Sequence, residues 1–88
     1  MDANHAEVVE AFRRLGFAVA DLSRLGSGIP DLAISRAGRT ALVEVKDGDK
    51  PPSARKLTPD EERFRDGWQG AYYVVQSCDD VEHVARTL

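Results

Sequence analysis

The sequence has few of the features that mark secreted or membrane proteins. Its one cysteine, Cys78, excludes an internal disulfide and favours a reducing compartment. No apolar run approaches the roughly 20 residues that a membrane-spanning helix needs. Residues 1–5 contain neither a basic start nor an apolar stretch, so no signal peptide is predicted. We therefore expect a cytoplasmic protein with no membrane partner.

Groups for covalent catalysis are equally scarce. The two histidines, His5 and His83, fall in separate predicted helices without a matching partner, and Cys78 has no obvious base. Nucleophilic catalysis by serine or cysteine needs such a base within hydrogen-bond reach. The sequence therefore predicts structural or surface roles for both histidines.

The net charge is small, but it is unevenly distributed. A formal charge of −3 argues at first against a nucleic-acid partner. Residues 24–56 nevertheless carry seven basic and four acidic side chains, whereas both flanking segments are acidic. If a cation neutralised Asp31 and Glu44, this central segment would present about five uncompensated positive charges. The middle third is therefore the part expected to meet an anionic partner.

Length and apolar pattern predict one α/β domain. The 88 residues, 42% of them apolar, suffice for a single modest core, so the domain is expected to span 1–88. The expected helices lie at 4–15, from 58 to about 70, and around 81–88, and the expected strands at 17–22, 31–35, 40–46 and 71–76. This order is typical of an α/β sandwich with a mixed sheet, in which the last strand is apolar enough to be central.

Local chemistry specifies two of the connections and one helix start. Residues 36–39 are of hairpin length, and 47–56, which contains two prolines, must be an irregular loop. Thr58, Pro59 and Glu61 match a capping box at the start of the second helix. Glu61 is therefore expected to cap this helix rather than to take part in catalysis.

The third predicted strand carries an acidic and a basic side chain on one face. Side chains alternate along a strand, so Glu44 and Lys46 share one face while the apolar residues of 40–46 occupy the other. If this strand pairs with the preceding one as a hairpin, Asp31 and Glu44 converge at the same end. Asp31 could instead be a simple turn residue, and Glu44 with Lys46 a solvated ion pair worth about 0–1 kcal/mol.

The first helix can supply a third carboxylate. With about 100° of rotation per residue, its apolar stripe centres near Phe12 and Leu15. Glu7 lies roughly 100° from that centre, on the flank, whereas Glu10 faces solvent. Glu7 is therefore the better candidate to reach over the sheet edge, the alternative being an ordinary solvated glutamate.

Carboxylates beside a lysine suit metal-dependent hydrolysis of phosphodiesters. Hard oxygen ligands hold Mg²⁺ or Mn²⁺, with water and phosphate oxygens completing the coordination shell. The metal lowers the pKa of bound water and neutralises charge in the transition state. Lys46 would orient or help to deprotonate the attacking water, and no serine, cysteine or histidine is required.

The spacing of these residues resembles a known nuclease signature. The run Gly28–Asp31, followed thirteen positions later by Glu44–Lys46, is similar to the PD-(D/E)XK motif. Four further segments resemble the VRR-NUC (virus-type replication-repair nuclease) branch: Asp47–Gly48, Pro52–Ser53, Leu57–Pro59 and Trp68–Gly70. The resemblance covers residues 4–77 and implies a restriction-endonuclease-like αβββαβ core with a C-terminal helix.

The resemblance also assigns roles by position. Asp31 and Glu44 match the central metal ligands, and Glu7 matches the acidic residue of the first helix. Lys46 matches the motif lysine, and Val45 supplies a backbone carbonyl to the metal. Stand-alone relatives of bacteria and phages resemble Holliday-junction resolvases, which implies a homodimer acting on four-way or otherwise branched DNA in the bacterial or phage-infected cell.

Residues that bind DNA are expected beside this cluster. Lys50, Arg55 and Lys56 are predicted to contact phosphates, the alternative being an exposed loop with no partner. Gly26 and Gly28 would let DNA approach the backbone, although a plain tight turn explains them equally well.

Three hypotheses follow. The leading one is a Mg²⁺- or Mn²⁺-dependent, structure-specific DNA endonuclease, whose two-fold dimer would make paired cuts. The second is a non-catalytic DNA-binding or partner-recruiting module that retains the nuclease fold. The third is a structural α/β adaptor without affinity for metal or DNA. The aromatic side chains are predicted to belong to the core or to a dimer interface: Phe64, Trp68, Tyr72 and Tyr73.

Overall fold

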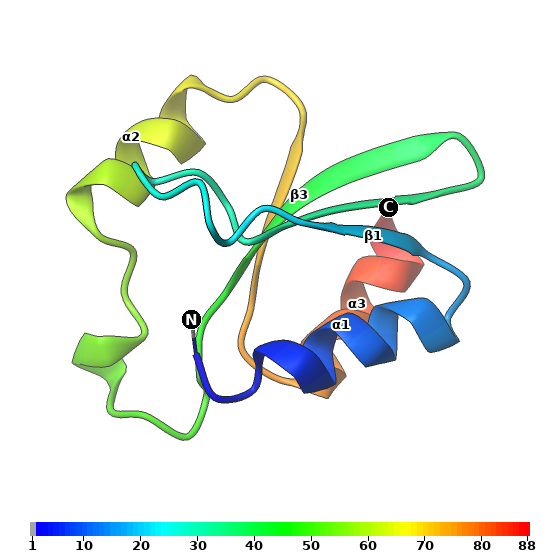
Figure 1. Cartoon of the computed structure of the whole chain (residues 1–88), viewed down its shortest axis with the longest axis horizontal. Coiled ribbons are helices and arrows are strands. Elements are labelled where there is room, and N and C mark those ends of the chain that lie inside the picture. Colours follow the sequence, from blue (N-terminus) through cyan, green and yellow to red (C-terminus); the bar gives the residue numbers. More distant parts are fainter. Residues whose placement is uncertain (1) are drawn as a thin grey trace.

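The computed structural model describes residues 2–88 and confirms the predicted order of helices and strands (Figure 1). Its elements are α1 (His5–Arg14), β1 (Ala18–Asp21), β2 (Leu32–Arg36), β3 (Arg39–Val45), a short 3₁₀ turn (Pro52–Ala54), α2 (Pro59–Gly67), β4 (Ala71–Val75) and α3 (Cys78–Thr87). The fold is the expected αβββαβ arrangement followed by a C-terminal helix.

The four strands form one mixed sheet in the order β1-β2-β3-β4. The first three are antiparallel neighbours, and β4 pairs with β3 in parallel after the crossover through α2. Ala37 and Gly38 join β2 to β3 with positive φ angles of 54° and 77°, the conformation that a tight two-residue hairpin needs. The predicted hairpin is therefore confirmed.

The prediction that 71–76 is a central strand is wrong, because β4 lies at the edge of the sheet. Its apolar character has another cause. Val75 is fully buried in the core, and Tyr73 packs against the same core from β4. The strand is apolar because helix α3 covers one of its faces, not because strands flank it on both sides.

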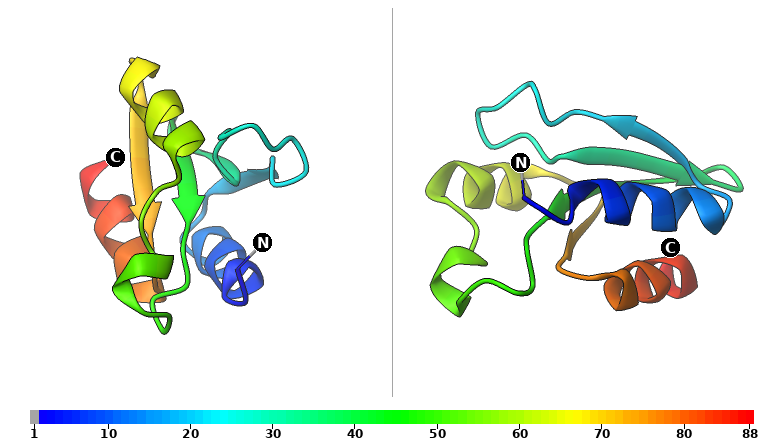
Figure 2. Two further views of the ribbon diagram at one scale, coloured as in Figure 1. Left: turned by 90° about the vertical axis from the view of Figure 1, so that its left-hand side faces the viewer. Right: turned by 60° about the horizontal axis from the view of Figure 1, so that its bottom comes forward.

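Helices α1 and α3 lie side by side on one face of the sheet and close the core there (Figure 2). The buried cluster comprises Val8, Phe12, Phe17, Leu32, Ile34, Ala41, Val43, Val45, Val75, Val81 and Val84. Helix α2 lies apart from the other two helices and buries none of its own residues (Figure 2). It presents Phe64 and Trp68, whose rings stack 5.6 Å apart, and Trp68 is 44% exposed.

Part of the positive charge in the central segment serves the fold. Arg36 donates to the carbonyl of Leu15 after α1 and to that of Ala85 in α3, each at 2.8 Å, and its guanidinium lies over the Phe17 ring. Arg39 donates to the carbonyl of Leu88. Cations bonded to the last carbonyls of helices complement the helix dipole. These two arginines are therefore held by helix ends.

Within residues 2–88, none of the helices is both long and apolar enough to span a membrane.

Candidate active site

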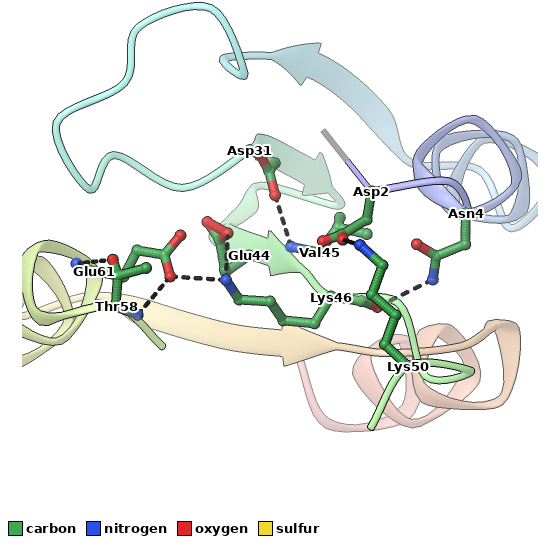
Figure 3. Close-up of polar contacts among 9 residues, drawn as sticks. All are labelled: Asp2, Asn4, Asp31, Glu44, Val45, Lys46, Lys50, Thr58 and Glu61. Carbon is green, nitrogen blue, oxygen red and sulfur yellow. Dashed lines mark hydrogen bonds and ion pairs between the residues drawn. The ribbon is translucent and has the colours of Figure 1, made fainter. Parts of the chain in front are cut away.

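The β2–β3 hairpin brings Asp31 and Glu44 together at one end of the sheet (Figure 3). In the register Leu32 opposes Val43, so Asp31 stands just before β2 at the level of Glu44. One oxygen of Asp31, Oδ2, accepts the backbone N–H of Val45 at 2.9 Å. The carboxylate of Asp31 is thus fixed by the strand that carries Glu44.

The polar face of β3 is buried rather than solvated. Ala41, Val43 and Val45 point into the core, as the alternation predicts. On the other face Glu44 is 4% exposed, and Lys46, which follows the strand, is 8% exposed. An exposed surface ion pair, the alternative explanation for these two residues, is therefore excluded.

Lys46 is held between two carboxylates from different elements (Figure 3). Its Nζ donates to Glu61 Oε1 at 2.8 Å and lies 3.9 Å from Glu44 Oε2. The same Glu61 oxygen accepts the backbone N–H of Thr58 at 2.8 Å, which completes the predicted capping box of α2. Glu61 therefore caps the helix and also binds Lys46.

Sequence reasoning missed this second contact of Glu61. The capping pattern is local, within four residues, and it explains the residue completely at that level. Only the crossover from β3 to the parallel strand β4 brings the start of α2 beside Lys46. No pattern of neighbouring residues in the sequence points to this contact.

Burial and neighbouring charge strongly perturb the acids of this cluster. Burial, reinforced by the negative charges of Asp31 and Glu61, raises the pKa of Glu44 to about 9. Tyr72 on β4 is affected by the same burial and negative charge. Burial together with the charge of Glu44 raises the pKa of its hydroxyl to about 12. That hydroxyl is buried and has no hydrogen-bond partner among the described residues.

The ion pair of Lys46 and Glu61 is stabilised in its charged form. Burial opposes ionisation of Lys46, but the hydrogen bond and charge of Glu61 outweigh it and hold the pKa of Lys46 above its usual value. Burial likewise opposes the charge on Glu61, but hydrogen bonds from Lys46 and Thr58 lower the pKa of Glu61 overall. Lys46 therefore remains an ammonium group at neutral pH.

The donor set fits a hard divalent cation. Glu44 and Glu61 lie beside the ammonium of Lys46, and the charges of Asp31 and Glu61 add to burial in raising the pKa of Glu44. Carboxylate oxygens are the ligands that Mg²⁺ and Mn²⁺ prefer. Among residues 2–88 no cluster of three or more histidine, cysteine or acidic side chains is spaced to hold a metal by itself. Water and phosphate oxygens would have to complete the shell.

The structure does not place Glu7 with this cluster. Glu7 is exposed and lines a depression of about 380 Å³ together with Asn4, Asp47, Gly48 and Cys78. The lining of that depression includes none of the four clustered residues Asp31, Glu44, Lys46 and Glu61.

The orientation of α1 explains the position of Glu7. The buried stripe of the helix runs through His5, Val8 and Phe12, whereas Leu15 is 39% exposed. The face that meets the core is thus rotated towards His5. With about 100° per residue, Glu7 then falls about 140° from the centre of the buried stripe, and not on its flank.

The expected structural role of His5 agrees with its surroundings. The side chain is buried, and Nε2 lies 3.1 Å from Oδ2 of Asp21 at the end of β1. Hydrogen bonds from the side chain and backbone of Ser23 lower the pKa of Asp21 to about 2. His83 is exposed on α3.

The predicted DNA-binding residues differ in their exposure and in their contacts with the rest of the chain. Lys56 is exposed, whereas Lys50 pairs with Asp2 at 3.0 Å and Arg55 is half-buried against the side chain of Gln76. All three belong to the loop that follows β3, beyond Lys46.

The two glycines also differ. Gly26 has a φ of +64° and open space around it, so a turn suffices to explain it. Gly28 has a φ of +80°, and a Cβ there would collide with the backbone of Asp60 at the start of α2. The close approach at Gly28 is therefore one between two parts of this chain.

The whole chain resembles a solved nuclease domain. No protein-family model matches it, and no curated protein does. It is similar to a solved structure titled "VRR_NUC domain", with 29% sequence identity, a TM-score of 0.65 and 98% of each chain covered. Likeness over this length, together with the αβββαβ order and the paired Asp31 and Glu44, supports a VRR-NUC domain of a nuclease family.

Proposed function

We propose that this chain is a divalent-metal-dependent DNA endonuclease. The observation that carries the proposal is the half-buried Asp31 paired with the buried Glu44, beside an ammonium that Glu61 holds in place. Burying charged groups is costly, and proteins retain such arrangements at functional sites. A structural adaptor would gain more stability from apolar residues at these positions.

In this proposal Asp31 and Glu44 hold the cation, and the backbone carbonyl of Val45 adds a third oxygen. A bound divalent cation supplies a Lewis acid that acidifies water and neutralises charge on the phosphate. Val45 N–H orients the Asp31 carboxylate through the bond at 2.9 Å. Glu7 is not part of this set, because it lines a depression to which none of these residues contributes.

Lys46 acts in this proposal as a fixed positive charge. Its pKa stands above the usual value, so it does not serve as the base that takes the proton from water. It instead donates hydrogen bonds to the attacking water or to a phosphate oxygen and stabilises the negative charge that develops there. Glu61 keeps the ammonium in position, 2.8 Å from its own carboxylate.

Branched DNA and a two-fold dimer form the finer part of the proposal. Two copies would present two sites, which suits the paired cuts that resolve a four-way junction. The exposed Trp68 and its stacked neighbour Phe64 offer an aromatic surface outside the core for such an interface. Lys56 and Lys50 would contact the phosphates next to the cut.

The test is cleavage of a labelled four-way junction beside matched duplex and single strand, each with Mn²⁺, Mg²⁺ or EDTA. Wild type is compared with Lys46→Ala and with Arg14→Ala, an exposed residue that pairs with Glu10 one turn away on α1. Circular dichroism establishes that each variant is folded. We expect metal-dependent cutting of the junction that Lys46→Ala abolishes and Arg14→Ala retains.

The other outcomes separate the alternatives. Cutting of duplex alone keeps the endonuclease and removes the junction preference. Tight DNA binding without any product, by folded wild type in either metal, contradicts the enzyme and supports the non-catalytic module. Sedimentation showing only monomer at micromolar concentration, with and without DNA, contradicts the dimer.

A further inference from the structure

The side-chain amide of Asn4 joins the ends of two strands beside the candidate site (Figure 3). Its Nδ2 donates to the backbone carbonyl of Lys46 and to that of Gln76, each at 3.1 Å, across 42 and 72 positions of the sequence. Building on the function proposed above, we propose that Asn4 is a positioning residue. It sets the backbone of Lys46 so that the ammonium stays between Glu44 and Glu61.

The two carbonyls lie where the sheet stops supporting the chain. Strands β3 and β4 end at Val45 and Val75, so Lys46 and Gln76 are the first residues beyond the paired region. Backbone acceptors inside a protein need a donor, and past a strand end the ladder no longer supplies it regularly. The carbonyl of Gln76 also accepts the N–H of Gly48 at 3.1 Å, and Asn4 adds a bond to each of the two carbonyls from one amide group, which fixes the two chain exits relative to each other.

Asn4 gives up a common helix-capping role to make these bonds. It directly precedes α1, where an asparagine side chain ordinarily accepts a backbone N–H of the first turn. Here it makes no capping bond, and its backbone, with φ −88° and ψ 5°, lacks the usual extended conformation. An absent cap costs helices about 1 kcal/mol.

The oxygen of the same side chain lowers the stability of the fold in a second way. Oδ1 of Asn4 is buried and finds no hydrogen-bond partner among residues 2–88. An unsatisfied buried acceptor costs stability, so natural proteins contain few of them. Departures from such local rules tend to occur at functional sites. What Asn4 contributes therefore lies in the two bonds that its N–H groups donate.

With Asn4 in place, Lys46 is fixed at three points. Its N–H donates to the carbonyl of Val75 at 2.9 Å, its carbonyl accepts from Asn4, and its ammonium donates to Glu61. A lysine side chain otherwise has many rotamers. Misplacing a catalytic group by about 1 Å can cost about 100-fold in rate.

Asn4→Ser is the informative variant, because serine is as good a residue as asparagine at the start of a helix but is too short to reach both carbonyls. Asn4→Asp is a second variant that keeps the shape and removes the donors. Asp80→Ala is the matched control: Asp80 accepts the N–H of Gln76 at 2.8 Å, so its loss loosens Gln76 without touching Lys46.

The first readout does not depend on activity. The NMR signal of the Lys46 ammonium, recorded in EDTA, reports whether the group stays hydrogen-bonded and ordered. The second readout is the single-turnover cleavage rate at saturating Mn²⁺ and DNA. We expect Asn4→Ser and Asn4→Asp to broaden the ammonium signal and to slow cleavage by about 10- to 100-fold, with DNA affinity unchanged. Asp80→Ala is expected to retain both the sharp ammonium signal and the cleavage rate of wild type.

An unchanged ammonium signal in folded Asn4→Ser and Asn4→Asp overturns the inference. A broadened signal with an unchanged cleavage rate also overturns it, because the positioning would then have no catalytic effect. If wild type does not cleave at all, the proposed function has failed. The ammonium signal still decides in that case whether Asn4 orders Lys46.

Discussion

Lys46 and Glu61 form an ion pair that ties the exit of a strand to the start of a helix, with 2.8 Å between Nζ and Oε1. Both side chains are largely enclosed, at 11% and 16% exposure. Helix α2 buries none of its own residues, and this pair attaches its start to the sheet, while Phe64 lies beside Tyr72 of β4. The position of α2 and the chemistry of the candidate site are therefore coupled.

Replacing Glu61 separates its two roles. Glu61→Ala removes the cap and leaves the ammonium of Lys46 enclosed without its partner, so we expect a loss of about 2–4 kcal/mol in the free energy of unfolding. Glu61→Gln still caps the helix and accepts a hydrogen bond from Lys46. Its loss in the free energy of unfolding is therefore expected to be clearly smaller. Urea unfolding measures both, with the exposed Glu62→Ala as control, expected within about 0.5 kcal/mol of wild type. Equal losses in the two Glu61 variants would contradict the ion pair.

The raised pKa of Glu44 predicts how stability depends on pH without metal. The folded protein holds the proton of Glu44 up to about 9, whereas the unfolded chain releases it near 4.5. The free energy of unfolding in EDTA therefore falls as pH rises between those values. We expect wild type to lose at least ~4 °C in Tm between pH 5 and 8 relative to Glu44→Gln. Parallel Tm curves for the two proteins would show that Glu44 is not perturbed.

Metal binding should offset this penalty at the same residues. Ions that bind only the folded state raise its stability, by about 2.7 kcal/mol at 100 times the dissociation constant. We expect Mn²⁺ to raise the Tm of wild type in a saturable way. Asp31→Asn and Glu44→Gln should lose this shift, whereas Glu7→Gln should keep it, because Glu7 lies outside the cluster. If Glu7→Gln lost the rise in Tm with Mn²⁺, Glu7 would have to be a metal ligand after all.

Tyr72 offers a test of the buried environment around the site. Its hydroxyl is buried without a partner, so Tyr72→Phe removes an uncompensated polar group and should raise the free energy of unfolding by about 1 kcal/mol. Tyr73→Phe is the opposite case, because its hydroxyl lies 2.9 Å from the hydroxyl of Thr87. That variant should lose about 0.5–1.5 kcal/mol. Thermal or urea unfolding of the two variants gives the sign of each change in stability. A destabilised Tyr72→Phe would mean that the Tyr72 hydroxyl is hydrogen-bonded.

Features that depend on neighbouring residues were predictable from the sequence. The alternation in β3 gave its core face, the capping box marked the start of α2, and the hairpin placed Asp31 opposite Glu44. Each follows from spacing over a few residues. The order of elements and the family resemblance agreed with these local patterns.

Features that depend on how distant elements meet were not predictable. The contact of Glu61 with Lys46 arises from the crossover, and Asn4 reaches carbonyls 42 and 72 positions away. The rotation of α1 follows from burial of His5, a residue that an apolar pattern does not count. The edge position of β4 follows from which strands pair, and the apolar content of the strand does not decide it.

The edge position of β4 leaves the proposed active site open to reversible loss of its geometry. An edge strand has a ladder partner on one side only, and such elements open more readily than central ones. Opening of β4 would release the carbonyls of Val75 and Gln76, and with them the bonds that Lys46 and Asn4 make there. The proposed arrangement around Lys46 would then be lost by local fraying, while the antiparallel strands β1, β2 and β3 remained folded. Amide hydrogen exchange at Lys46 would report how often that happens.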